Sequence, residues 1–151
     1  MAAASLVATA FGVLLILITA YILAAGILGL ATTVSEAQKE MTAMSVKITS
    51  TSLSITSVSM NDTLCLIDIE NTGSEIIAYE YTDVYLKASD SSWDYFSYNQ
   101  SAINKWSFTN QNPETWVPGE TINITVYTSG DDYTRVQVTT AVGVSASHSI
   151  P

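Results

Sequence analysis

The stretch FGVLLILITAYILAAGILGLA, from Phe11 to Ala31, decides how this chain folds. Its 21 residues carry no charge, and no charged residue occurs anywhere between Met1 and Ser35. Because an α-helix rises ~1.5 Å per residue, this stretch alone would cross the ~30 Å hydrocarbon core of a bilayer. The segment therefore predicts a helix that is surrounded by lipid or by other apolar helices.

A secretory signal peptide does not account for this segment. Such signals join a basic start to an apolar centre of roughly 7–15 residues, whereas no Lys or Arg precedes Lys39 here. A membrane anchor also normally carries basic residues on its cytoplasmic side. We therefore expect that a short basic leader preceded Met1 and was removed by processing.

The helix is expected to continue past the apolar run. Residues 35–44 read SEAQKEMTAM, in which Met41 and Met44 fall at helical spacing among charged residues, a pattern typical of an amphipathic helix. A helix that ran to about residue 48 would be ~70 Å long, more than twice the thickness of the bilayer core. We expect a helical domain over residues 1–48, whose last turns leave the membrane, and a second domain over residues 49–151.

Small residues recur at four-residue spacing in the apolar run, as in Ala25 with Gly29. Such pairs let helix backbones approach closely, although Ala and Gly are also common in single membrane-spanning helices. Thr19 and Tyr21 lie in the middle of the run. We expect their hydroxyls to need polar partners, which a bundle of helices would supply more readily than lipid.

The rest of the chain has the pattern of β-strands. Apolar and polar residues alternate over residues 121–127 and 133–144, which predicts strands with one buried face. Strands are also predicted at 63–70 and 76–87, and Leu64 and Leu66 suggest that the first of these is buried on both faces. The predicted inward-facing residues include Cys65, Ile67, Ile69, Ile122, Ile124, Val126, Val136, Val138, Val142 and Val144.

Turn signals separate these runs at residues 71–73, 117–119 and 129–132. The apolar residues Val46 and Ile48 are out of phase with Leu53 and Ile55, which predicts a kink or bulge where the β region opens. Several short strands with turns between them favour an antiparallel β-sandwich of the immunoglobulin type. The predicted fold class is α+β, a long hydrophobic helix followed by this all-β head.

Composition excludes some classes of function. The chain has 14 acidic and 5 basic residues and a formal net charge of −9, so a role in binding nucleic acid is not expected, because phosphate contacts need clusters of Lys and Arg. The single cysteine, Cys65, cannot form an intrachain disulfide. Its place in an apolar strand predicts a buried structural thiol.

The sequence offers no recognisable catalytic constellation. The one histidine, His148, lies close to the C-terminus, where a tail residue is the expected interpretation, and no phosphate-binding loop, nucleophile elbow or Cys/His metal cluster occurs. We therefore expect no enzyme activity and no cofactor. Two acidic clusters could bind Ca²⁺ or could simply be solvated turn carboxylates; they are Asp90 with Asp94, and Asp131 with Asp132.

Two further features concern the surface of the predicted head. Three N-glycosylation sequons occur, at Asn61, Asn99 and Asn123. Aromatic residues are concentrated between Tyr79 and Trp116. They could fill the core, contact other subunits or form a carbohydrate-binding face.

The layout resembles archaellins and the wider archaeal type IV pilin-like family. The similar parts are the uncharged start MAAASLVATAFGVLLILITAYILAAGILGLATTVSEAQ, the segment LCLIDIENTGSEIIAYEYTDVYL with its NTG turn, and the W-x-PGE lead into a strand in WVPGETINITVYTSG. Bacterial-type pilins usually have a glutamate at mature position five, whereas this chain has Ser5 and in this respect is similar to archaellins.

The resemblance implies a subunit of a helical extracellular filament, an archaellum or related pilus for motility or adhesion at the archaeal cell surface. Such a subunit is held in the membrane first, is processed by a prepilin-type peptidase, and is then polymerised with its own copies by an assembly platform and a separate ATPase. The alternative is a single-pass, stator-like or surface-layer-binding protein. The residues expected to pack in a filament core are Phe11, Leu14, Leu15, Ile18, Tyr21, Ile22, Ala25, Gly26 and Gly29.

Overall fold

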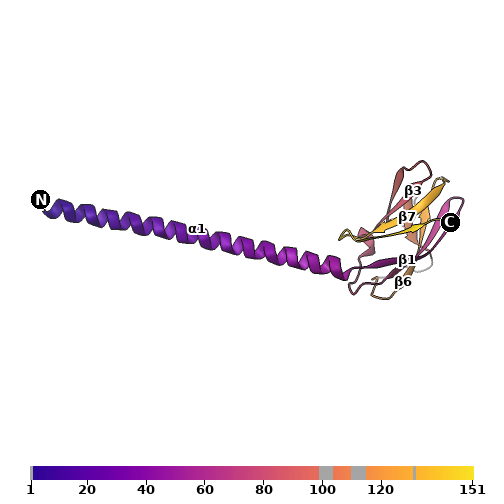
Figure 1. The fold of residues 1–151 in the computed structure, drawn as a ribbon, viewed down its shortest axis with the longest axis horizontal. Helices are drawn as coiled ribbons and strands as arrows, with labels where there is room; N and C mark the ends of the chain where they lie inside the picture. The colour runs from indigo at the N-terminus through magenta and orange to yellow at the C-terminus, as the bar shows by residue number, and fades with distance from the viewer. Residues whose placement is uncertain (1, 99–103, 110–114, 131) are drawn as a thin grey trace. The chain divides into compact units, whose positions relative to one another are not determined.

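The computed structural model describes residues 2–98, 104–109, 115–130 and 132–151, with side chains from Val7 onward. The chain divides into two compact units, residues 1–43 and residues 44–151. Helix α1 (Ala2–Ser50) forms all of the first unit and contributes its last turns to the second. The second unit, called the head below, consists of those turns and an all-β domain (Figure 1).

Helix α1 is 49 residues long and contains no proline. It continues through Val46 and Ile48, so the prediction that these residues open the β region was wrong. The physical reason is that nothing between Met44 and Ser50 breaks a helix, and that the Thr51 amide still donates to the Lys47 carbonyl at 3.1 Å. The phase change in the apolar pattern therefore marks the end of the helix, not a kinked strand.

The described residues of the head form eight strands and one short 3-10 helix. The elements in chain order are β1 (Leu53–Asn61), β2 (Leu64–Asn71), η1 (Tyr79–Tyr81), β3 (Asp83–Ala88), β4 (Trp93–Tyr98), β5 (Lys105–Phe108), β6 (Thr121–Tyr127), β7 (Tyr133–Thr139) and β8 (Ser145–Ser149).

The strands form one continuous sheet in the order β1-β2-β6-β5-β4-β3-β7-β8, which folds into a sandwich. One layer is β1-β2-β6-β5 and the other is β8-β7-β3-β4, which is the strand arrangement of immunoglobulin-type sandwiches. All described pairings are antiparallel except that of β4 with β5, which is parallel. Because β1 and β8 also contact each other, the sheet has no widely separated edges. The predicted fold class is confirmed.

The core lies between the two layers. It is built from β-branched and leucine side chains that alternate along β2, β3, β6 and β7, closed by two tryptophans and a phenylalanine; its fully buried members include Ile67, Ile69, Val84, Leu86, Phe96, Trp106, Trp116, Ile124, Val126, Val136 and Val138. Strand β1 contains a bulge, because its pairing with β2 shifts between Ile55 and Ser57, inside the strand and not where the β region opens.

The structure corrects three strand predictions. Residues 76–87 are not one strand, because η1 interrupts them before β3 begins at Asp83. Strand β2 is buried on one face only, since Leu66 is 38% exposed. Strand β7 ends at Thr139, and Val142 and Val144 lie in or beside the turn that precedes β8. His148, expected to be a mobile or packed tail residue, lies on β8 and is paired with Val136.

We expect Trp106→Ala to lower the free energy of unfolding of the head by about 3–5 kcal/mol, because it empties a large core site. Trp106 is 1% exposed, and its indole donates to the Thr82 carbonyl at 3.1 Å. Urea unfolding of the full chain in detergent, followed by labelling of the buried Cys65 thiol, would measure this change.

The control is Trp93→Ala, which removes a tryptophan that is 45% exposed. Its expected cost is about 1 kcal/mol or less. Equal costs for the two substitutions would show that Trp106 is not a core residue.

Candidate functional site

Helix α1 contains a segment that is long and apolar enough to cross a membrane. The nine residues predicted to pack in a filament core all lie on α1 and are exposed within this single chain. A methyl group added at Gly26 or Gly29 would meet no other atom within 4 Å. Whatever covers this surface is outside the described chain, and the filament packing of these residues stays a prediction.

The hydroxyls of the apolar segment differ in their hydrogen bonding. Thr19 donates to the carbonyls of its own helix, with 2.9 Å to both the Leu15 and Ile16 oxygens. Thr32 and Thr33 likewise bond to the Gly29 carbonyl. The expectation that Thr19 needs a partner from another helix was therefore wrong, because threonine in a helix can satisfy itself.

Tyr21 differs from these threonines. Its side chain is 76% exposed, and its hydroxyl has no hydrogen-bond partner among the described residues. A phenol at the middle of a span is costly to place in hydrocarbon without a partner. Among the described polar side chains in the middle of the run, only Tyr21 therefore still lacks a hydrogen-bond partner.

The C-terminal end of α1 is fixed to the head by the predicted turn at Asn71-Thr72-Gly73. The Ser74 amide donates to the Ser50 carbonyl at 2.8 Å, and the Thr72 and Gly73 amides donate to the Ser52 carbonyl at 3.0 and 3.1 Å. Carbonyls at a helix end lack partners within the helix. The turn supplies those partners and so closes the helix.

Asn71 connects this turn to the W-x-PGE segment. Its side chain is fully buried and donates to the carbonyls of Glu75 at 2.8 Å and Trp116 at 3.2 Å. Its backbone also forms two hydrogen bonds with the W-x-PGE segment. The Asn71 amide donates to the Glu120 carbonyl, and the Gly119 amide donates to the Asn71 carbonyl. The indole of Trp116 also donates to the Glu120 carbonyl at 3.0 Å.

The NTG turn and the W-x-PGE turn are therefore two halves of one junction. Gly119 has a φ of +78°, a conformation that suits glycine in such a turn. Gly73 is needed for a different reason, since a Cβ there would lie 2.5 Å from the Ser50 oxygen. These short motifs hold the helix end on the sandwich.

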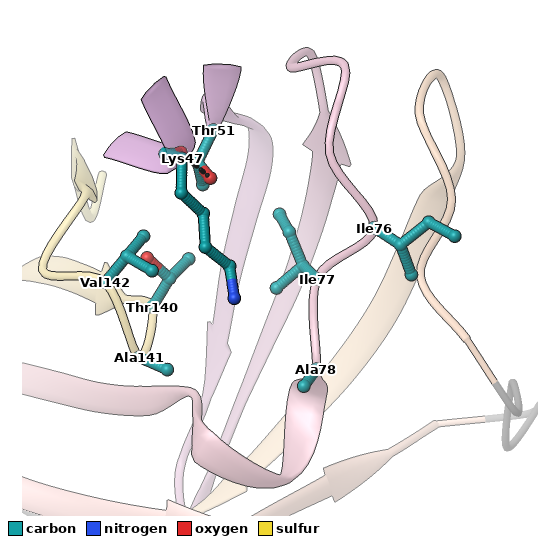
Figure 2. Close-up of a pocket in the computed structure, with 8 residues that line it drawn as sticks. All are labelled: Lys47, Thr51, Ile76, Ile77, Ala78, Thr140, Ala141 and Val142. Carbon is teal, nitrogen blue, oxygen red and sulfur yellow. Dashed lines mark hydrogen bonds between the residues drawn. The ribbon is translucent and has the colours of Figure 1, made fainter. Parts of the chain in front are cut away.

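A small hollow lies beside this junction (Figure 2). Figure 2 shows Lys47 extending from the end of α1 between Ile77 on one side and Thr140 and Val142 on the other. The hollow measures about 70 Å³, far below the roughly 300–1,000 Å³ typical of small-molecule sites. It is a gap in the packing at the junction and not a substrate pocket.

The two predicted acidic clusters meet at one end of the sandwich. Asp90, Asp94 and Asp132 line an open, polar hollow of about 510 Å³, while Asp131 lies outside the described residues. Asp90 accepts from the Ser92 amide at 2.8 Å, and bonds from Ser92 lower the pKa of Asp90. Asp94 accepts from the Tyr133 hydroxyl. Among the described residues no three such groups are placed to hold a metal ion, so Ca²⁺ binding stays a prediction.

The thiol of Cys65 is buried, as predicted. Burial raises the pKa of Cys65 to about 11. Because the thiolate is the reactive form, this thiol is inert at neutral pH while the head stays folded.

The aromatic residues divide between core and surface. Trp106, Trp116 and Phe96 are buried, and Tyr79, Tyr98 and Phe108 form an edge-to-face cluster beside them. Trp93 and Tyr95, in contrast, are 45% and 52% exposed. Within β4 the direction of each side chain decides the matter, because Phe96 points inward while Trp93 and Tyr95 point outward.

The described sequons lie in different settings, and Asn99 lies outside the described residues. Asn61 is exposed at the β1–β2 turn. Asn123 lies in the middle of β6, where its amide nitrogen donates to the Asp68 carboxylate, and the sequon's Thr125 is buried.

We expect Gly73→Ala to lower the free energy of unfolding by about 2 kcal/mol or more, because the new methyl group would collide with backbone atoms of residues 50–52. Urea unfolding of the full chain measures this change. The control is Thr72→Ala, which removes one exposed hydrogen bond to Ser52 and should cost about 1 kcal/mol or less. A neutral Gly73→Ala would contradict the close approach.

If the chain is glycosylated, we expect sugar on Asn61 and none on Asn123. The side-chain nitrogen to which a glycan would attach donates a hydrogen bond to Asp68 at Asn123, and of the two described sequons only Asn61 has no such bond. Peptide mass spectrometry of chain from native cells tests this, with Asn61→Gln and Asn123→Gln as the matched pair. Sugar on Asn123 alone would reverse the assignment.

Comparison with known proteins places these features in a family. Two solved structures share the head fold. The archaellum periplasmic stator protein FlaG from Sulfolobus acidocaldarius has a TM-score of 0.56 and 21% identity over 66% of this chain and 99% of its own. The complex of the archaellum periplasmic stator proteins FlaF and FlaG from the same organism contains a chain with a TM-score of 0.55 and 20% identity, over 65% of this chain and 87% of that one.

No curated protein matches the sequence. The family model for archaeal-type flagellin, however, matches residues 8–150, which include both the apolar helix and the whole head. The resemblance found in the sequence motifs is thereby confirmed. This chain belongs to the archaeal-type flagellin family.

Proposed function

We propose that this chain is a structural protein of an archaellum-type machine at the archaeal cell surface. In this proposal α1 remains in the membrane as a single-pass anchor, and the head forms part of a fixed, stator-like assembly outside the lipid. This proposal is the alternative given in the sequence analysis, a single-pass, stator-like protein in place of a filament subunit. The names of the two similar solved proteins, both called archaellum periplasmic stator proteins, support this choice.

The observation that carries the proposal is the self-contained hydrogen bonding of the apolar helix. Every backbone group in the middle of a helix is satisfied within it, as lipid requires. The threonine hydroxyls at positions 19, 32 and 33 are satisfied in the same way. Apart from the Tyr21 phenol, this bonding lets the helix stay in a bilayer without neighbours. Its strongest apolar run, residues 11–30, has the ~30 Å length of the hydrocarbon core.

The junction gives the head a role that fits an anchor. A stator-like protein must resist load between the membrane and the structure that its head contacts. The bonds from residues 72–74 to residues 50 and 52, together with buried Asn71, connect the last turn of α1 to the β1-β2-β6-β5 layer of the sandwich. The C-terminal end of α1 is therefore bonded directly to the sandwich of the head.

The similar structures also suggest a kind of partner. One of them is a complex between FlaF and FlaG, which are both archaellum proteins. We expect that the head of this chain, too, binds a second head-bearing protein of its machine.

A filament subunit remains the second candidate, and Tyr21 is the observation that favours it. Its phenol lacks a described partner in the middle of the span, and a neighbouring helix could provide one. In that case the nine predicted packing residues would be buried by other copies. The peptidase, assembly platform and separate ATPase implied by the resemblance would then also be required.

We expect the double substitution Gly26→Leu and Gly29→Leu to leave the chain functional as an anchor. Leucine is well tolerated in a lipid-exposed helix, whereas it would push apart helices that pack at these glycines. The measurement is swimming speed and membrane abundance of the chain in cells that carry the variant. Ile27→Leu, an apolar change on the same turn, is the control.

Loss of filaments and of swimming in the double variant, with normal membrane abundance, would favour the filament subunit. Tyr21→Phe adds a second test. A lone anchor should keep its membrane abundance without the hydroxyl, whereas a bundle that bonds this hydroxyl should be weakened.

A further inference from the structure

The outward face of the β4-β3-β7-β8 layer carries an unusual set of side chains. Pairing places Trp93 beside Lys87 and Lys87 beside Arg135, in one row across three strands. The next row places Tyr95 beside Tyr85 and Tyr85 beside Gln137. Below, the aromatic-cationic face means Tyr85, Lys87, Trp93, Tyr95 and Arg135.

The two cations on this face are placed where like charges lower the stability of a sheet. Lys87 and Arg135 are direct cross-strand partners, and like charges in that position are destabilising. Neither side-chain cation has an ion pair or hydrogen bond within the described residues. The chain has only 5 basic residues against 14 acidic ones, so an opposite-charge pair would have been easy to form. A pair of like charges that destabilises the sheet, and that no local bond compensates, indicates a functional role for the two residues.

The aromatic residues on the same face are exposed and held in place. Trp93 is 45% and Tyr95 is 52% exposed. The rings of Tyr85 and Tyr95 lie 5.4 Å apart, and the Tyr95 hydroxyl donates to the Asp83 carboxylate at 2.8 Å. Asp83 lies two rows from the Lys87–Arg135 pair, and the row that holds the two cations contains no carboxylate.

We propose that the aromatic-cationic face binds an acidic polysaccharide, such as a chain of uronate sugars. The Cβ atoms of direct cross-strand partners lie about 5 Å apart, so the long side chains of Lys87 and Arg135 can both reach one sugar carboxylate, and the positive pair selects an anion. Flat rings such as Trp93 and Tyr95 stack on the C–H faces of sugar rings. Hydroxyl and amide groups on β7 and β8, namely those of Gln137, Ser147 and Ser149, continue the same rows.

A protein partner fits this face less well. Outward-pointing residues of the four strands are aromatic, charged or small and polar, and none is aliphatic; they are Asp83, Tyr85, Lys87, Trp93, Tyr95, Ser97, Arg135, Gln137, Thr139, Ser145, Ser147 and Ser149. The centre of a protein interface is normally apolar and low in charge. Here the charged pair lies between the aromatic residues of β4 and the hydroxyl groups of β8, in the last of the three outward rows.

The test uses the full chain in nanodiscs of phosphatidylcholine, whose headgroups carry no net charge. We expect it to bind oligogalacturonate, to bind neutral galactose oligomers much more weakly, and to lose binding as salt rises. Lys87→Glu should weaken oligogalacturonate binding at least about tenfold, because it converts the like-charge pair into an ion pair. The same variant should resist urea as well as the parent or better, so misfolding cannot explain the loss.

Two control variants match the changes in charge and aromatic area. Lys39→Glu alters the net charge equally but lies on α1 outside the head, and it should leave binding unchanged. Trp93→Ser should weaken binding, whereas Tyr81→Ser, which removes a 67% exposed ring on η1, should not.

Three results would overturn the proposal. The parent chain could fail to bind oligogalacturonate. Polyglutamate could bind as tightly as the sugar, which would assign the face to an acidic protein. Sedimentation could show that the parent self-associates and that Lys87→Glu abolishes this, which would assign the face to a second copy. None of these results depends on whether α1 acts as an anchor or as a filament core.

Discussion

The hydrogen bonds that close the C-terminal end of α1 join two parts with opposite solvent requirements. The apolar run must be kept from water, while the acidic head must be hydrated. The charged turns of residues 35–44 lie between the apolar run, which ends near Ala31, and the helix end at Ser50, whose carbonyl accepts from the Ser74 amide. Without these bonds the last carbonyls of the helix would lack partners, and the sandwich would lose the contacts that fix its first strand.

The same region explains why two short motifs resembled a family. The NTG turn and the W-x-PGE turn are far apart in sequence, yet Asn71 bonds to both the backbone of Trp116 and that of Glu120. The residues of each turn are needed because they form hydrogen bonds with the other turn. Sequence reasoning could identify the motifs as turns, but their mutual contact is a property of the fold.

Much of the fold could be predicted from periodicity. The long helix follows from 35 residues without charge, and β2, β6 and β7 follow from alternation. Strand β8, with the sequence SASHS, has no apolar alternation to reveal it. Strand β5 is short and pairs in parallel with β4, so no hairpin signal precedes it.

The candidate surfaces were less predictable than the fold. Whether Thr19 needs a neighbour depends on its rotamer, and the structure shows that it bonds to its own helix. Whether Lys87 lies opposite Arg135 depends on strand register, which no single segment encodes. Both facts concern function more than stability, and both required the three-dimensional arrangement.

The central claim is that α1 stays in lipid while the head works outside it. The most direct measurement is to shear archaella from native cells, purify the fibres for electron cryomicroscopy, and locate this chain by mass spectrometry. We predict that the chain stays with the membranes after shearing, is released by detergent and is absent from the fibres. Fibres built from this chain, with its apolar helices at their axis, would contradict the claim.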